Sequence, residues 1–82
     1  MDRPHIEYPC WWDYTLIGPD EENLRLAIGE LARGREHRVA FSKLSAQKRY
    51  ASLHVDIWVT AEEDRNRLFQ AFQAHPAVKI VI

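Results

Sequence analysis

Hydrophobic and polar residues alternate most regularly over residues 50–60, which read YASLHVDIWVT. Successive side chains of a β-strand point to opposite faces of its sheet, so this period of two predicts a strand. Its apolar side chains share one face, which we expect to be buried: Leu53, Val55, Ile57 and Val59. Polar and aromatic side chains share the other face: Tyr50, Ser52, His54, Asp56 and Trp58. A row that mixes aromatic with polar side chains is unusual on a face that contacts only solvent, so we expect any function to use this face.

Three further segments predict strands. Residues 11–17, WWDYTLI, alternate and end at a Gly-Pro pair. One face of this strand carries Trp12, Tyr14 and Leu16, and the opposite face carries Trp11, Asp13 and Thr15. Residues 37–45 alternate around Val39 and Phe41 and form a hairpin with residues 50–60. The β-branched run of residues 77–82 predicts a last strand, with Val78, Ile80 and Ile82 on one side.

Two segments predict helices. The first begins at Asp20, a good N-cap, and ends near Gly34. Its apolar stripe consists of Leu24, Ala27, Ile28 and Leu31. The second begins where Thr60 and Glu63 match a capping box, and Pro76 stops it. Its stripe consists of Leu68, Phe69, Phe72 and His75.

The order strand, helix, strand, strand, helix, strand predicts an α+β fold, a two-layer ferredoxin-like βαββαβ sandwich. Its four-stranded antiparallel sheet has the order 4-1-3-2, with both helices on one face and the other face open. The expected core consists of Trp12, Tyr14, Leu16, Leu24, Ile28, Leu31, Val39, Phe41, Leu53, Val55, Ile57, Val59, Leu68, Phe72 and Ile80.

Composition limits the class of protein. A chain of 82 residues makes one domain at most, which we place at residues 10–82 after a flexible N-terminal arm at residues 1–9. With 46% hydrophobic and 28% charged residues, and no long apolar run, it is expected to be globular, without a membrane span. The N-terminus lacks the apolar stretch of a secretory signal, and the single Cys10 cannot form an internal disulfide. We therefore expect a cytoplasmic protein.

Several short motifs together resemble a known family. They are Tyr8-Pro9 opening the first strand, Trp12, Tyr14 and Gly18 along and after it, Tyr50-Ala51-Ser52 opening the third strand, and His75-Pro76-Ala77-Val78-Lys79 near the end. Over roughly residues 8–82 the chain resembles the YbeD-like family of small bacterial ferredoxin-like proteins of unknown function, whose fold is similar to the ACT regulatory domains. Relatives tend to have a Ser-Lys-Gly step before the tyrosine, and here the glycine is missing, which indicates a different turn. The resemblance supplies no catalytic residues; it implies regulation, with a loose link to lipoate metabolism.

The predicted open face suggests three functions. Its residues are Trp11, Asp13, Thr15, Tyr50, Ser52, His54, Asp56 and Trp58. Exposed tryptophans among polar groups are typical of interface anchors, which favours a non-catalytic regulatory or protein-interaction module bound to a partner protein or to itself as a homodimer. The alternatives are an ACT-like sensor that binds a small molecule and dimerises, and an RNA-binding sheet with exposed aromatics. The face is equally compatible with cover by the N-terminal arm.

Charge and chemistry add little to this picture. Residues 33–49 carry six basic side chains and one acidic one, a balance of +5, which leaves −6 on the remainder. The predicted basic patch consists of Arg35, Arg38, Lys43, Lys48 and Arg49, facing an anionic partner or simply solvent. His54 and Asp56 share a face, but two ligands make a poor zinc site, and a His–Asp hydrogen bond is the simpler interpretation. Without a phosphate-binding glycine loop or a base beside Cys10, we expect no enzyme, no metal and no cofactor.

Overall fold

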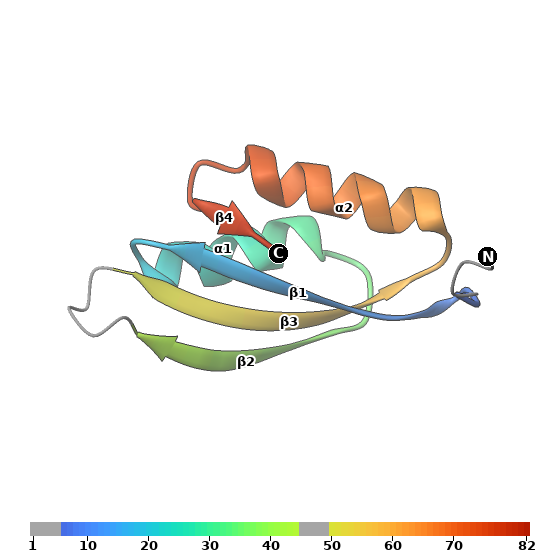
Figure 1. Ribbon diagram of the computed structural model, residues 1–82, viewed down its shortest axis with the longest axis horizontal. Coiled ribbons are helices and arrows are strands. Elements are labelled where there is room, and N and C mark those ends of the chain that lie inside the picture. Colours follow the sequence, from blue (N-terminus) through green and yellow to red (C-terminus); the bar gives the residue numbers. More distant parts are fainter. Residues whose placement is uncertain (1–5, 45–49) are drawn as a thin grey trace, which may run out of the picture.

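The computed structural model describes residues 6–44 and 50–82. The elements follow the order β1 (Cys10–Gly18), α1 (Glu21–Leu31), β2 (His37–Leu44), β3 (Ala51–Val59), α2 (Glu62–Ala74) and β4 (Ile80–Val81). They form one antiparallel sheet in the order β2-β3-β1-β4, which is the expected 4-1-3-2 read from the other edge. Both helices lie on one side of this sheet and leave its other side open (Figure 1). The ferredoxin-like α+β sandwich is therefore confirmed.

The register between β1 and β3 fixes which side chains share a face. The two strands pair without a break from Cys10 opposite Val59 to Gly18 opposite Ala51. Residues opposite one another in a sheet lie on the same face, so Tyr14 lies beside Val55 under the helices and Asp13 lies beside Asp56 on the open side. The alternation predicted for both strands is thus the alternation observed.

The last strand differs from the prediction. Ile80 is 52% exposed, and it is Val81 that packs against the core. A turn closed by the Val78 N–H and the His75 carbonyl precedes β4, so Val78 is buried without belonging to the strand. Pairing Val81 with Leu16 then places Val81 on the buried face of β1.

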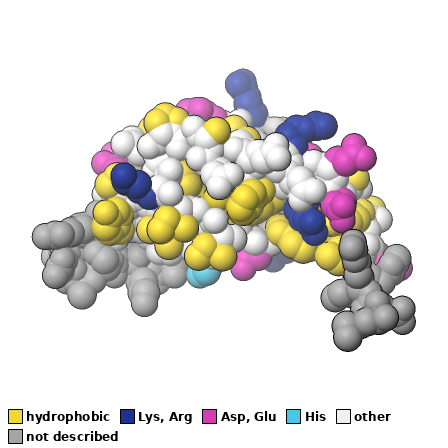
Figure 2. All heavy atoms as spheres, turned by 45° about the horizontal axis from the view of Figure 1, so that its top comes forward, with side chains coloured by type: hydrophobic (Ala, Val, Ile, Leu, Met, Phe, Trp, Pro, Cys, Tyr) yellow, Lys and Arg dark blue, Asp and Glu magenta, His cyan; other side chains and the backbone are white. Residues whose placement is uncertain are grey.

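Figure 2 turns the molecule so that α2 comes forward, and it shows hydrophobic side chains gathered along the surface in this view.

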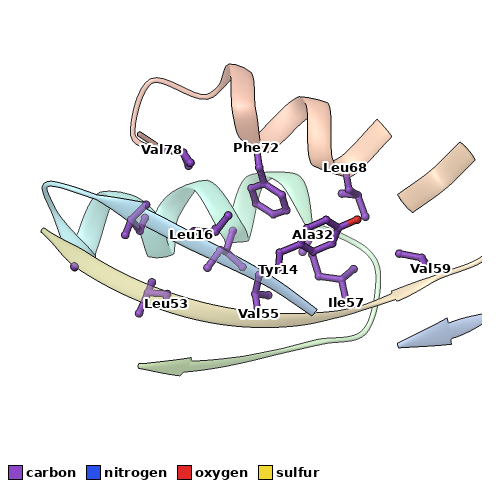
Figure 3. Close-up of a cluster of buried hydrophobic side chains, with 13 residues drawn as sticks. Tyr14, Leu16, Ala32, Leu53, Val55, Ile57, Val59, Leu68, Phe72 and Val78 are labelled. Carbon is purple, nitrogen blue, oxygen red and sulfur yellow. The ribbon is translucent and has the colours of Figure 1, made fainter. Parts of the chain in front are cut away.

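The core lies between the sheet and the helices. Figure 3 shows Phe72 of α2 pointing down beside Tyr14 of β1; the two ring centres are 5.6 Å apart. The Tyr14 hydroxyl donates a hydrogen bond of 2.6 Å to the Arg65 carbonyl, which satisfies the one polar atom of this buried side chain. Predicted core residues that are buried are Tyr14, Leu16, Leu24, Ile28, Leu53, Val55, Ile57, Val59, Leu68 and Phe72. Three more, Trp12, Leu31 and Val39, are only partly buried against that core, and the Phe41 side chain lies outside the description.

The two helix starts follow different chemistry. Asp20 caps α1 as predicted, since its carboxylate accepts the N–H of Asn23 at 3.1 Å. The predicted capping box of Thr60 and Glu63 is wrong, because Ala61 is the N-cap of α2 and has no side-chain bond. The Thr60 N–H instead donates to Asp64 at 3.1 Å, one residue further along the helix.

The predicted division into an arm and a domain stays a prediction. Residues 1–5 lie outside the description, whereas Tyr8, within the predicted arm, is partly buried against the core. In the described part of the chain, neither helix has the length and apolar character that crossing a membrane requires.

Candidate interaction face

The open face of the sheet is built by alternate residues of three strands. Strand β1 supplies Trp11, Asp13, Thr15 and Ile17; β3 supplies Ser52, His54, Asp56 and Trp58; β2 supplies Arg38 and Ala40. Seven of the eight predicted face residues thus lie in paired strands. The eighth, Tyr50, precedes β3 and lines a small hollow with Ile17, Lys79 and Ile80 at one end of the sheet.

Aromatic rings gather at the other end. Trp11 and Trp58 are direct partners across β1 and β3, with ring centres 5.4 Å apart and planes at 70°, an edge-to-face contact. From β2, the guanidinium of Arg38 lies 4.3 Å from the centre of the Trp11 ring. A cation above an aromatic face is attracted to its negative surface, so Arg38 belongs to this cluster as well as to the predicted basic patch.

Polar groups occupy the middle of the face. The hydroxyl of Thr15 lies 2.9 Å from Nδ1 of His54, and a carboxylate oxygen of Asp13 lies 4.0 Å from the same nitrogen. The hydrogen-bonding partner of His54 is therefore Thr15 across the strand pair, and not Asp56 on its own strand. Among the described residues, no three His, Cys, Asp or Glu side chains gather where they could hold a metal ion.

The predicted basic patch is only partly described. Arg35 is not a free surface cation, because it donates two hydrogen bonds to the Asp64 carboxylate and one to the Trp58 carbonyl. Arg38 lies over Trp11. The Lys43 side chain, Lys48 and Arg49 fall outside the description, so the patch itself stays a prediction.

Three ionisable groups of the described residues have displaced pKa values: Asp64, its partner Arg35, whose pKa is raised by the hydrogen bonds to Asp64, and Tyr14. Hydrogen bonding from Arg35, the largest cause, lowers the pKa of Asp64 to about 2. Burial, the largest cause for Tyr14, raises the pKa of its hydroxyl to about 12. All three groups therefore keep one protonation state near neutrality, and their role is in the stability of the fold.

Sequence reasoning missed a groove between β1 and α2. It has a volume of about 780 Å³ and is lined by Trp12, Asp13, Tyr14, Thr15, Arg65, Asn66, Phe69 and Ile82. The guanidinium of Arg65 lies 4.4 Å from the centre of the Trp12 ring and forms one wall. The groove exists because β4 pairs with only part of β1. The sequence predicts a six-residue strand at residues 77–82, whereas β4 has two residues, so the groove was not expected.

Known proteins that are similar to this chain share its fold and are described as uncharacterised or of unknown function. The chain is 30% identical over 72 residues to an uncharacterised protein of Campylobacter jejuni, covering 88% of this chain and 83% of that protein. It is 28% identical over 85 residues to a UPF0250 protein of Hahella chejuensis, covering 99% and 93%. The solution structure of protein HP0495 from Helicobacter pylori matches with a TM-score of 0.84 at 27% identity, covering 98% of this chain and 88% of that one. These relatives confirm the YbeD-like resemblance, and the model of DUF493, a protein family of unknown function, matches residues 3–82, so the chain belongs to that family.

Proposed function

We propose that this chain is a non-catalytic, regulatory protein-interaction module that binds its partner through the Trp11 end of the open face. The observation that carries the proposal is the cluster of Trp11, Trp58 and Arg38, three side chains from three neighbouring strands, in which Trp11 contacts both of the others. Trp and Arg are the residue types most enriched among the side chains that dominate binding energy at protein interfaces.

The cluster is held in place before any partner arrives. Its members project from paired strands, and ring contacts restrict the rotamers of Trp11 and Trp58. A preorganised anchor loses less side-chain entropy on binding than a mobile one does. Trp11 is also 36% exposed, so part of its ring remains available for burial by a partner.

The same geometry argues against catalysis on this face. Thr15, His54 and Asp13 have the residue types of a nucleophile, a base and an orienting acid. Both Thr15 and Asp13, however, approach Nδ1 of His54, whereas a triad needs its nucleophile and acid on different ring nitrogens. The geometry does not set this histidine up to pass a proton between them.

RNA binding is less favoured for an electrostatic and a steric reason. One face of Trp11, the side chain that a base would stack on, lies under the Arg38 guanidinium. Asp13 and Asp56 lie opposite one another in the centre of the sheet, where a phosphate backbone would pass.

A site-specific photocrosslinker tests the proposal. Benzoylphenylalanine replaces Ala40, which is exposed on the open face, or Leu26, which is 60% exposed on α1 and serves as the control site. We expect capture of one protein, or of a second copy, from Ala40 and not from Leu26. Affinity for the purified partner is then measured for Trp11→Ala and Arg38→Ala, with the exposed Arg67→Ala as matched control.

The expected result is a loss of about tenfold or more for the face variants and no change for the control. Equal capture at both positions, or equal affinity of all variants, would contradict the proposal. Captured RNA whose affinity falls steeply with salt would establish the RNA-binding alternative. A melting temperature raised by one metabolite from an amino-acid and lipoate-related panel would establish the sensor alternative.

A further inference from the structure

We infer that the unpaired edge of β1 is a second binding site, which accepts an extended peptide segment of another protein as an added strand beside α2. This site lies at the edge of the sheet and uses the backbone of Trp11, whereas the open-face cluster uses the Trp11 side chain. Its elements are the backbone of Trp11 and Asp13 and the groove between Trp12 and Phe69.

Backbone hydrogen bonding shows which edge is free. Thr15 exchanges two bonds with Ile82, of 3.1 and 2.9 Å, and the Ile17 carbonyl accepts the Lys79 N–H at 2.8 Å. Alternate residues of a strand direct their backbone groups to the same edge, so Trp11 and Asp13 direct theirs to the edge used by Thr15. Among the described residues, none pairs with them there; the pairing of β1 with the C-terminal segment extends from Ile17 to Thr15, which bonds to Ile82.

The free edge of β1 lies beside a groove that is lined by residues of β1 and α2. In Figure 1, β4 covers one end of β1 while α2 continues along the rest of the strand. The groove of about 780 Å³ lies at that uncovered part, and Phe69, 36% exposed, faces it from the helix. Figure 2 shows the exposed hydrophobic side chains of this side of the molecule. An added strand would therefore satisfy backbone groups and bury apolar surface together.

Strand geometry fixes the chemistry of the occupant. The peptide residue bonded to Asp13 points to the open face, and its two neighbours point inward, toward Trp12 and Phe69. Apolar side chains suit those two inward positions. The Asp13 side chain is 61% exposed, so a Lys or Arg between the apolar residues complements its charge. A second copy of this chain is a less favourable occupant. If two copies paired through this edge, their Asp13 carboxylates would lie close together and repel one another.

The test selects ligands from a phage-displayed library of random decapeptides against the whole chain. We expect enriched sequences in which a basic residue lies between two apolar ones. The Trp11 and Asp13 amides should exchange rapidly in the free protein, and bound peptide should slow their exchange. N-methylation of the peptide residue that bonds to Asp13 should weaken binding about five- to tenfold, since it removes a main-chain donor, and methylation of its neighbour should not.

Protein variants test the groove separately. Phe69→Glu should weaken peptide binding about tenfold, whereas Leu26→Glu, the same change on exposed α1, should leave it unchanged. The inference is overturned if no sequence is enriched, or if enriched peptides leave exchange at Trp11 and Asp13 unaltered. Protection of these amides that rises with protein concentration alone identifies a second copy as the occupant and also overturns it. Binding lost in Trp11→Ala but kept in Phe69→Glu assigns the peptide to the open-face cluster instead.

Discussion

Arg35 and Asp64 form an ion pair through two hydrogen bonds, of 2.6 and 2.9 Å, between the loop before β2 and the first turn of α2. The same guanidinium donates to the Trp58 carbonyl at 3.2 Å, and the same carboxylate accepts the Thr60 N–H. Paired bonds between guanidinium and carboxylate fix geometry as well as charge. This pair therefore joins the end of the strand that carries Trp58 to the helix behind the sheet.

The ion pair predicts an acid-dependent stability. The pKa of Asp64 is lowered to about 2 in the folded chain, chiefly by hydrogen bonding from Arg35, while an unfolded Asp titrates near about 4. Because the folded value is the lower one, the stabilisation is complete above about pH 4 and is lost as the pH falls toward 2. We expect Asp64→Asn to reduce the free energy of unfolding by about 1 to 2 kcal/mol at pH 7 and by little at pH 2, in urea titrations.

The neighbouring Glu63→Gln is the matched control for that experiment, because Glu63 is exposed on the same helical turn. It should leave stability within about 0.5 kcal/mol of the parent at both pH values. A deficit in Asp64→Asn that is as large at pH 2 as at pH 7 would show that the ion pair is not its cause.

The raised pKa of Tyr14 predicts that the stability of the fold also falls at high pH. Burial raises the pKa of its hydroxyl to about 12, above the unfolded value of 10.0. The stabilisation is therefore complete below about pH 10 and is lost as the pH rises from 10 to 12. Absorbance at 295 nm should show one of the three tyrosines ionising near pH 12, and that step should be missing in Tyr14→Phe. Retention of the late step in Tyr14→Phe would contradict the prediction.

Most of the fold could be predicted from the sequence where a strand has neighbours on both sides. In β3, every residue from Leu53 to Val59 lies on the face that alternation assigned to it. A central strand must bury one face, so a slip of one residue would place all its apolar side chains in water. The family resemblance is likewise confirmed over nearly the whole chain.

Features that depend on tertiary partners could not be predicted. Nothing local to residues 77–82 reveals that a turn delays β4, which moves Val81 rather than Ile80 onto the core. The sequence identifies Arg38 only as a basic residue, because its contact with Trp11 spans two strand pairings. The groove beside Phe69 results from the shortness of β4, so it too was missed. The alternation of residue types along a strand predicts which face each side chain lies on. Where a strand ends, and where a long side chain lies, depend on the tertiary contacts around them.

Tyr8 and Tyr14 predict contrasting effects of the same substitution. The hydroxyl of Tyr8 is buried and has no hydrogen-bond partner in the described structure, whereas that of Tyr14 donates to the Arg65 carbonyl. Removing an unsatisfied buried hydroxyl removes a desolvation penalty. Tyr8→Phe should therefore leave the free energy of unfolding unchanged or raise it by about 1 kcal/mol, and Tyr14→Phe should lower it by about 1 kcal/mol, in urea titrations. A larger loss in Tyr8→Phe than in Tyr14→Phe would contradict this assignment.

Two glycines predict opposite responses to alanine. A Cβ at Gly18 would come within 2.3 Å of the Ala77 carbonyl oxygen, a backbone atom that cannot move without shifting the turn before β4. At Gly29, inside α1, a Cβ meets nothing within 4 Å. Gly29→Ala should raise the free energy of unfolding by about 0.5 to 1 kcal/mol through helix propensity. Gly18→Ala should lower it by about 1 to 3 kcal/mol. Thermal melts that rank the two variants the other way would show that the turn yields freely.

Val55 tests the assignment of the sheet faces. Its side chain is 0% exposed beneath the helices, while Ala40, one residue beyond the β2 partner of Val55, is exposed on the open face. Burying an unpaired carboxylate mid-sheet costs several kcal/mol, comparable to the roughly 5 kcal/mol total stability of so small a domain, so Val55→Asp should be unfolded at room temperature. Ala40→Asp adds the same charge opposite His54 and should melt within a few degrees of the parent. If circular dichroism shows a cooperative, native-like melt for Val55→Asp, then the helices do not cover the face on which Val55 lies.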